Sequence, residues 1–132
     1  MEQQIIKQLI KEAHNALEHS YSPYSNYKVG AALLTKSGRI VTGTNIENAS
    51  YPAGMCAERV AVAKAVSENE RQFETIVIVA HDEHNLPYPC GICRQTLHEF
   101  SPNLKVIVAK SETEYETHLL SELLPHSFTL KK

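Results

Sequence analysis

Short apolar runs alternate along this chain with helical segments, and this alternation constrains the fold more than any other feature of the sequence. The runs at residues 75–81 and 104–110 are rich in β-branched residues and are typical of buried strands. The segment between them, residues 90–100, is expected to be helical. Because strands joined by a helical crossover pack into one sheet, this part of the chain indicates an α/β fold.

The rest of the chain supplies further elements for the same sheet. A turn at Ser37-Gly38 joins two strands into an antiparallel hairpin. We expect a helix over residues 2–19, strands over 27–35 and 39–45, a helix over 55–68, a short strand over 114–117 and a last helical turn over 119–124. The predicted architecture is a three-layer α/β/α fold, a mixed five-stranded sheet with helices on both faces.

The length of the chain predicts a single domain over residues 1–132. A chain of this size buries about two-thirds of its unfolded surface, which is enough for a core without disulfides. The net charge of −2 at pH 7 argues against a protein that coats nucleic acid or an anionic membrane. The apolar runs are far shorter than the roughly 20 residues that span a bilayer. The first residues are polar, unlike a signal peptide. We therefore expect a cytoplasmic protein that binds neither nucleic acid nor membranes.

Three cysteines carry the strongest indication of chemistry. An odd number cannot pair fully within one chain, and the cytoplasm keeps thiols reduced. Cys56 is expected at the start of one helix and Cys90 and Cys93 at the start of another, each after a strand and a loop. Sites in open α/β sheets form at the carboxyl ends of strands, so both helix starts can converge. A helix N-terminus also favours the thiolate that a metal needs.

Three thiolates leave one coordination position of a zinc ion open, as in catalytic zinc sites. Glu58 lies two residues after Cys56, where its carboxylate can move protons to and from a bound water without binding the metal. The charge of three thiolates weakens the pull of zinc on that water. Two helix N-termini oppose this effect, and Arg59 or Arg94 can oppose it further by donating hydrogen bonds to the sulfurs.

Other interpretations of these residues stay open at this point. The C-x-x-C pair alone fits a thioredoxin-like redox site, which leaves Cys56 unexplained. A closed structural zinc site needs a fourth ligand, which one of the 7 histidines can supply. Glu58 alone fits an ordinary acidic residue in a first helical turn. The run from His81 to His84 has the composition of a second metal site but is expected to be a solvated loop.

Two motifs resemble the signature of zinc-dependent nucleoside and nucleobase deaminases, namely Cys56-Ala57-Glu58 and Pro89-Cys90-Gly91-Ile92-Cys93. Further segments are similar, in order, to the small cytidine deaminases: Pro23-Tyr24-Ser25, residues 29–34, residues 45–51, Arg59, Arg94-Gln95 and residues 122–125. The resemblance covers nearly the whole chain and implies a cytidine deaminase-like fold. The three-cysteine form resembles the homotetrameric branch of that family.

The resemblance implies a role for each part of the two motifs. Cys56, Cys90 and Cys93 would hold one zinc ion per subunit, and Glu58 would act as the proton shuttle. Hydroxide made by zinc and Glu58 would attack C4 of the cytosine ring. Glu58 would then protonate N3 and the departing ammonia.

The resemblance also implies residues that contact the nucleoside. Asn45 and Glu47 would bind the sugar, Tyr27 would pack against the nucleoside, and the backbone of Ala57 would contact O2 of the base. Each residue has a simpler interpretation as well. Asn45 fits turn chemistry, Glu47 fits an acid exposed to solvent, and Tyr27 fits an ordinary residue at a strand start.

A homotetramer with active sites shared between subunits follows from the same resemblance. Tyr51 and Phe128 resemble aromatic residues of the family that reach into a neighbouring subunit's site. Simple packing of the tail is the alternative interpretation of Phe128. The only other partners expected are the small nucleoside substrate and water.

The predicted reaction is hydrolytic deamination of cytidine and 2′-deoxycytidine to uridine and 2′-deoxyuridine in pyrimidine salvage, with release of ammonia. A cytosine-bearing antibiotic such as blasticidin S is the main rival substrate, because its deaminase shares the metal motifs, but Asn45 and Glu47 favour a ribose. A polynucleotide-editing deaminase needs a basic groove with stacking aromatics, whereas this chain is mildly acidic. A non-catalytic zinc module would need a fourth protein ligand and no Glu58.

Overall fold

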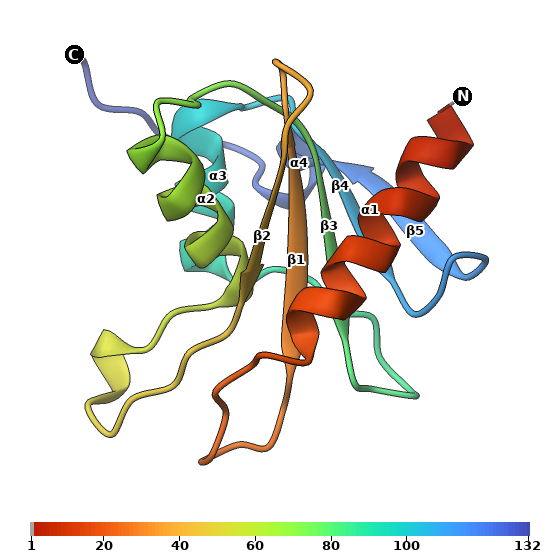
Figure 1. The fold of residues 1–132 in the computed structure, drawn as a ribbon. Helices are drawn as coiled ribbons and strands as arrows, with labels where there is room; N and C mark the ends of the chain where they lie inside the picture. Colours follow the sequence, from red (N-terminus) through yellow and green to blue (C-terminus); the bar gives the residue numbers. More distant parts are fainter. Residues whose placement is uncertain (1) are drawn as a thin grey trace.

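A five-stranded mixed sheet forms the middle layer of the structure, a computed structural model that describes residues 2–132 (Figure 1). The strands are β1 (Val29–Thr35), β2 (Ile40–Thr44), β3 (Phe73–Ala80), β4 (Lys105–Ala109) and β5 (Tyr115–Leu119), and their order in the sheet is β2-β1-β3-β4-β5. The neighbours β3 and β4, which a helical crossover joins, are parallel, and the other neighbouring pairs are antiparallel. The predicted mixed five-stranded sheet is therefore confirmed.

Helices cover both faces of the sheet, as predicted. The helix α1 (Glu2–Leu17) packs on one face, against β1, β2 and β3. The helices α2 (Ala57–Ser67) and α3 (Gly91–Phe100) lie side by side on the opposite face, where the short α4 (Leu120–Leu123) contacts α3. The arrangement confirms the three-layer architecture. No helix within residues 2–132 has the length and apolar character needed to cross a membrane.

The central strands are buried on both sides, which explains their continuous apolar sequences. In β3, Ile76 and Ile78 join the core beneath α2 and α3, whereas Val77 and Val79 join the core beneath α1. Successive side chains of a strand point to opposite faces, so one strand serves both cores. Every predicted helix and strand is present in this part of the chain, with bounds that differ by at most two residues.

Two glycines allow helices to approach the sheet closely. A Cβ atom on Gly43 of β2 would lie 2.3 Å from the carbonyl oxygen of Ala57 and 2.6 Å from the nitrogen of Ala61. A Cβ atom on Gly30 of β1 would lie 2.1 Å from the carbonyl oxygen of Ala13. Any larger residue at Gly43 would therefore push away the first turns of α2, the helix that begins directly after Cys56.

Three loops gather at one end of the sheet, at the bottom of Figure 1. They are residues 18–28 before β1, residues 45–56 between β2 and α2, and residues 81–90 between β3 and α3. Ile46 of the second loop forms one isolated β-bridge with Tyr21 of the first loop and another with Met55 at the far end of its own loop. The second loop also contains a short 3₁₀ helix, Tyr51–Ala53, where only a loop was predicted. Because α2 and α3 begin at this end, the loops surround both helix starts.

Candidate active site

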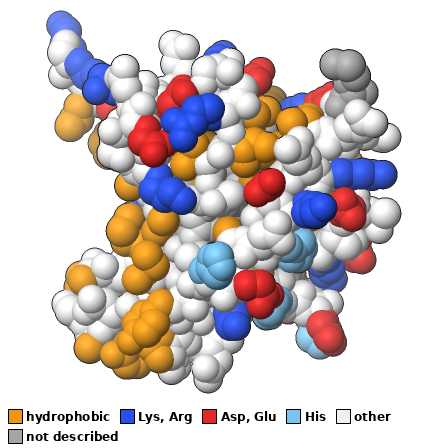
Figure 2. Space-filling view, viewed as in Figure 1, with side chains coloured by type: hydrophobic (Ala, Val, Ile, Leu, Met, Phe, Trp, Pro, Cys, Tyr) orange, Lys and Arg blue, Asp and Glu red, His pale blue; other side chains and the backbone are white. Residues whose placement is uncertain are grey.

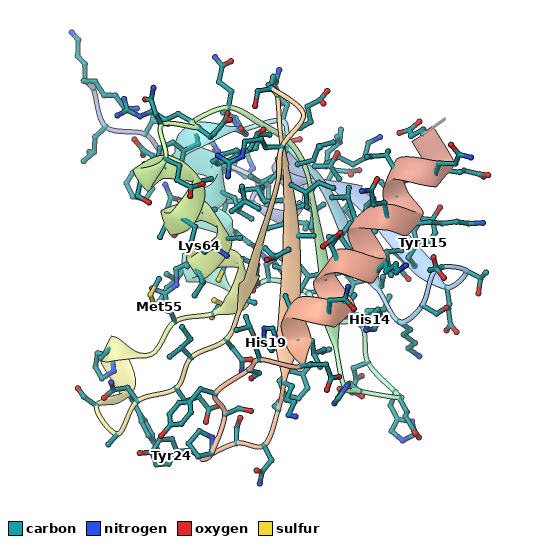
Figure 3. The ribbon with its side chains drawn as sticks, viewed as in Figure 1. His14, His19, Tyr24, Met55, Lys64 and Tyr115 are labelled. Carbon is teal, nitrogen blue, oxygen red and sulfur yellow. The ribbon has the colours of Figure 1, made fainter. Side chains whose placement is uncertain are left out.

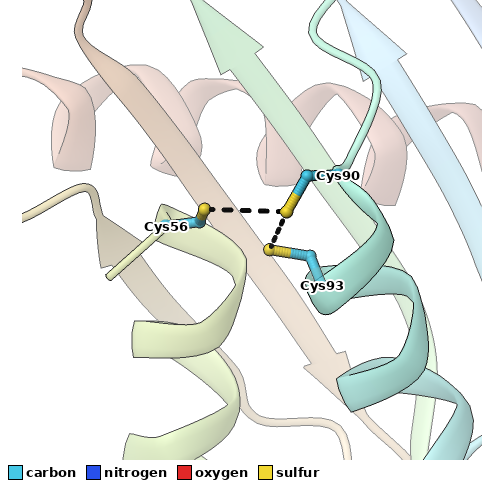
Figure 4. Close-up of side chains that lie close together, drawn as sticks. All are labelled: Cys56, Cys90 and Cys93. Atoms are coloured by element: carbon cyan, nitrogen blue, oxygen red, sulfur yellow. Dashed lines mark hydrogen bonds between the residues drawn. The ribbon is translucent and has the colours of Figure 1, made fainter. Parts of the chain in front are cut away.

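The starts of α2 and α3 meet at this end of the sheet, and their cysteines form a compact cluster (Figure 4). Cys56 caps α2, Cys90 caps α3, and Cys93 lies in the first turn of α3. The sulfurs of Cys56 and Cys90 are 3.9 Å apart, and those of Cys90 and Cys93 are 3.5 Å apart. All three sulfurs lie within 4.8 Å of one another. The two helix starts thus converge, as expected from their positions after strands.

The cluster fits a zinc ion in spacing and in donor type. Sulfur ligands about 2.3 Å from a tetrahedral metal lie about 3.8 Å from one another, close to the separations of these sulfurs. The unpaired N–H groups at each helix N-terminus also favour thiolates. Among residues 2–132, these cysteines are the only group of at least three metal-ligating side chains, and they include no histidine or carboxylate. The set therefore leaves a fourth position for a ligand from outside the protein.

The three thiols hold their protons unequally. A hydrogen bond with Cys93 lowers the pKa of Cys56 to about 5, against the effect of burial, and contacts with Cys90 and Arg59 contribute in the same direction. The contact with Cys56, together with burial, raises the pKa of Cys93. Negative charge therefore resides first on Cys56, beside the guanidinium of Arg59.

Glu58 lies in the first turn of α2 and is almost fully buried, with only 4% of the residue exposed. Burial raises the pKa of its carboxyl group to about 7, against a hydrogen bond from its own backbone N–H, and the charge of Cys56 adds to the rise. A carboxyl group with a pKa near neutrality can both accept and release a proton at pH 7. This carboxyl group is therefore suited to proton transfer.

The two arginines beside the cysteines make different contacts. Nη2 of Arg59 donates to the carbonyl oxygen of Gly54 at 3.1 Å, and its Nε is buried without a hydrogen-bond partner in the protein. Arg94 donates from Nε to Pro89 O at 2.7 Å and from Nη1 to Leu123 O at 2.6 Å. Arg59 is thus placed beside Cys56, whereas Arg94 ties the start of α3 to the chain on either side of it.

A pocket of about 460 Å³ opens above the cysteine cluster. The predicted site residues that line it are Tyr27, Asn45, Glu47, Tyr51, Cys56, Ala57, Glu58, Arg59 and Cys90. Cys93 lies beneath them and is fully buried. Phe128 is 64% exposed in the C-terminal tail and does not line the pocket. Figure 2 shows apolar side chains gathered at the lower left, over the loops of residues 18–28 and 45–56, and Figure 3 labels Tyr24 and Met55 on these two loops.

Asn45 is buried directly after β2, and both the oxygen and the nitrogen of its side-chain amide are hydrogen-bonded. Its Oδ1 accepts hydrogen bonds from Ser20 Oγ at 2.5 Å and from the backbone N–H of Val29 at 3.0 Å. Its Nδ2 donates to the carbonyl oxygen of Tyr27 at 2.8 Å. An amide nitrogen carries two hydrogens, so Asn45 keeps one donor for a ligand while its acceptor is occupied.

Glu47 follows on the same loop, and its carboxylate is bound by the turn at Tyr24 and Ser25. Its Oε1 accepts from the backbone N–H of Tyr24 at 2.9 Å and of Ser25 at 3.1 Å, and its Oε2 accepts from the Ser25 hydroxyl. The hydrogen bond from the Ser25 hydroxyl is the main cause that lowers the pKa of this carboxyl group, and the backbone N–H groups of Ser25 and Tyr24 add to it, against the opposing effect of burial. Glu47 therefore stays charged and can accept hydrogen bonds from a ligand.

The model of the cytidine and deoxycytidylate deaminase zinc-binding region matches residues 3–110. The chain belongs to the cytidine and deoxycytidylate deaminase family. The family resemblance seen in the sequence is thereby confirmed, as is the enzyme class: the chain is a hydrolase of the cytidine deaminase family.

Individual relatives agree with this membership. The cytidine deaminase of Halalkalibacterium halodurans is 48% identical over 122 residues, which are 92% of each chain. The blasticidin-S deaminase of Bacillus cereus is 33% identical over 112 residues, 80% of this chain and 79% of that one. The crystal structure of cytidine deaminase from Burkholderia pseudomallei has a TM-score of 0.86 and 40% identity, and covers 92% of this chain and 97% of that one. The last comparison confirms the predicted fold class.

Some pocket residues were not predicted from the sequence. Ser25 belongs to the Pro23-Tyr24-Ser25 motif, but the sequence did not indicate its hydrogen bond to Glu47. Pro87 and Tyr88 form the wall of the pocket beside Cys90, and only their place in a Pro-Tyr-Pro run before that cysteine pointed to them. All three residues lie in loops, and the spacing of sequence motifs does not determine the conformation of a loop.

Proposed function

We propose that this deaminase hydrolyses cytidine and 2′-deoxycytidine to uridine and 2′-deoxyuridine and releases ammonia in pyrimidine salvage. The observation that carries the proposal is the buried carboxyl of Glu58 beside three converging thiols, in a pocket that also presents Asn45 and Glu47. The first part of this set suits activation of water, and the second part suits binding of a sugar.

The metal in this proposal is zinc, one ion per chain, held by Cys56, Cys90 and Cys93. When bound, zinc lowers the pKa of a water ligand toward about 7, which makes a nucleophile available at neutral pH. The N-termini of α2 and α3 and the guanidinium of Arg59 offset part of the negative charge of the thiolates. Arg94 contributes by holding the backbone beside Cys90.

Glu58 moves the protons of the reaction. Its carboxylate accepts a proton from the attacking water, whose oxygen forms a bond to C4 of the cytosine ring. The same carboxyl group passes this proton to N3. It then accepts the second proton of that oxygen and delivers it to the amino group, which leaves C4 as ammonia when the C–N bond breaks and the C4 carbonyl forms. Burial raises the pKa of Glu58 to about 7, so at neutral pH its carboxyl group can both accept a proton and release one.

The remaining pocket residues hold the nucleoside. The free N–H of Asn45 donates to a sugar hydroxyl, and the carboxylate of Glu47 accepts from one. The backbone N–H of Ala57, at the start of α2, has no partner within the helix and donates to O2 of the base. Tyr27 lines the pocket from the loop just before β1 and packs against the nucleoside.

We further propose that the chain is a single domain over residues 1–132 and acts in the cytoplasm as a homotetramer with shared active sites. Tyr51 and Phe128 are 79% and 64% exposed, so both are available to a neighbouring subunit. Sedimentation or light scattering should report the mass of four chains.

The activity itself is tested by incubating the purified, zinc-loaded protein with cytidine, 2′-deoxycytidine, blasticidin S and a cytosine-containing oligonucleotide. We expect loss of cytosine absorbance and release of ammonia with both nucleosides. Elemental analysis should find one zinc ion per chain. Turnover of blasticidin S without turnover of either nucleoside would contradict the proposal, because Asn45 and Glu47 are assigned to the hydroxyl groups of a ribose or deoxyribose.

A further inference from the structure

The wall of the pocket beside Cys90 belongs to a loop without regular structure. Pro87 and Tyr88 line the pocket directly before this cysteine. Residues 81–90 contain no helix or strand. The position of the wall, and of the sulfur that follows it, therefore depends on contacts that the loop makes with the rest of the protein.

Tyr88 is held by two residues of β5, the strand at the edge of the sheet. Its hydroxyl donates a hydrogen bond to Oε1 of Glu116. Its ring lies against the ring of His118, with centroids 5.6 Å apart and planes inclined by 58°. Nε2 of His118 lies 3.1 Å from the same oxygen of Glu116. We call these three residues the Tyr88 clamp.

Glu116 joins the other two members of the clamp. Glu116 and His118 are two residues apart on a strand, so their side chains lie on the same face of β5. Hydrogen bonds from Tyr88 and His118 lower the pKa of the Glu116 carboxyl. The phenol of Tyr88 therefore donates to a charged acceptor, and such bonds are stronger than those between neutral groups.

Two other tethers hold the same loop through its backbone. Arg94 donates to the carbonyl oxygen of Pro89 at 2.7 Å, and Lys110 donates to that of Glu83 at 3.0 Å. These tethers fix the loop on both sides of Tyr88, while the clamp fixes the side chain that lines the pocket. No residue of β5 lines the pocket itself.

We propose that Glu116 and His118 are positioning residues for the deamination, which act through Tyr88 on the pocket wall and on the sulfur of Cys90. The proposal rests on the proposed function for its substrate, a cytosine nucleoside. The wall beside the thiols faces the space that the pyrimidine ring would occupy. A loosened clamp would weaken the binding of the nucleoside and the retention of zinc, but it would leave Glu58 in place.

The test compares Tyr88→Phe, Glu116→Ala and the double variant with wild type. Thr117→Val is the matched control, because Thr117 is an exposed residue of β5 between the two clamp residues. One measurement is the rate at which each protein loses zinc to an excess of a coloured chelator. The other is kcat and KM for cytidine with fully zinc-loaded protein.

Each single variant should lose zinc about tenfold faster than wild type, the lower end of the effect that groups bonded to a metal ligand have on metal affinity, because the clamp reaches Cys90 only through the loop. KM should rise about fivefold, the effect of one hydrogen bond, with kcat within about twofold of wild type. The double variant should match the single ones, because both substitutions break the same contact. The control should behave as wild type.

Zinc loss and KM equal to wild type in both single variants would overturn the proposal, even if those variants melt at lower temperature. Effects that add in the double variant would overturn it as well. A wild-type protein that binds zinc but does not deaminate cytidine would instead refute the proposed function. The zinc-loss measurement would then still decide the role of the clamp.

Discussion

The inner and outer parts of the pocket are built in different ways. We call Cys56, Glu58, Cys90 and Cys93 the floor of the pocket and Ser25, Asn45, Glu47 and Tyr51 its rim. The floor stands on the first turns of two helices that pack on the sheet. The rim belongs to two loops, residues 18–28 and 45–56, which hydrogen-bond to each other. These loops carry exposed side chains such as Tyr51.

The two carboxyl groups of the pocket show what this difference means for chemistry. Burial on the floor raises the pKa of Glu58 to about 7. Hydrogen bonds from Ser25 and Tyr24 on the rim lower the pKa of Glu47. The same functional group is thus adapted to exchange protons in one place and to remain an anion in the other. The floor is suited to reaction and the rim to recognition.

Substitution of Glu58 should give the largest effect. Glu58→Gln keeps the shape of the side chain but removes the group that we propose moves the protons, so kcat should fall by about 10²–10⁴-fold. Zinc content should stay at the wild-type level, because the three thiols are intact. Glu74→Gln, at an exposed glutamate of β3, is the control. If Glu58→Gln turned over cytidine as fast as wild type, Glu58 would not be the proton-transfer group, and the distinction drawn between Glu58 and Glu47 would be wrong.

Gly43→Ala tests the support of the floor without changing a floor residue. The new Cβ atom would lie 2.3 Å from the carbonyl oxygen of Ala57, so α2 must shift. The free energy of unfolding should fall by about 1–3 kcal/mol, as for other overpacked sites, and kcat should fall as Glu58 moves. Urea unfolding and steady-state kinetics measure the two effects.

Gly91→Ala is the matched control for this experiment, because nothing lies within 4 Å of its added Cβ atom. It should be as stable as wild type or more stable by about 1 kcal/mol at most. If Gly43→Ala were equally stable, the close approach of α2 to β2 would not be what supports the floor.

Ser25→Ala should give the smallest effect, confined to the rim. The substitution removes the hydroxyl that binds Glu47, so the carboxylate is less firmly held for the contact with the sugar that we propose. KM for cytidine should rise about fivefold with kcat unchanged. Ser37→Ala removes a similar bond, to Glu70 at 2.7 Å, in the turn between β1 and β2, and should leave KM unchanged. A fall in kcat in Ser25→Ala would show that a change in the rim also affects the reaction at the floor.

The sequence indicated which residues of the floor lie together better than it indicated the contacts of the rim, for a physical reason. Cys56, Cys90 and Cys93 follow strands and begin helices, so regular geometry brings them together without knowledge of any loop. The partners of Ser25 and Tyr88 lie 22 and 28 residues away along the chain, and they depend on loop conformations that no periodicity encodes. The resemblance to a family indicated Asn45 and Glu47, but not the groups that hold them.

The contacts of Arg94 and Gly43 were missed for related reasons. Arg94 was one of two arginines expected to donate to the sulfurs, but its hydrogen bonds reach two backbone carbonyls, one of them in α4 at Leu123. Nothing in the sequence distinguishes Gly43 from another small residue in a strand, and only the packed structure shows that α2 lies against it. Both contacts depend on how distant elements pack, which local patterns do not specify.

The position of α1 has a practical consequence for handling the enzyme. This helix lies on the face of the sheet opposite to α2 and α3, and it contributes no residue to the pocket. Its outer positions, such as the exposed Lys11, are separated from the thiols by the whole thickness of the sheet. A fluorophore or a link to a solid support at Lys11 would therefore leave the pocket open, and zinc exchange and turnover could be followed on the immobilised protein.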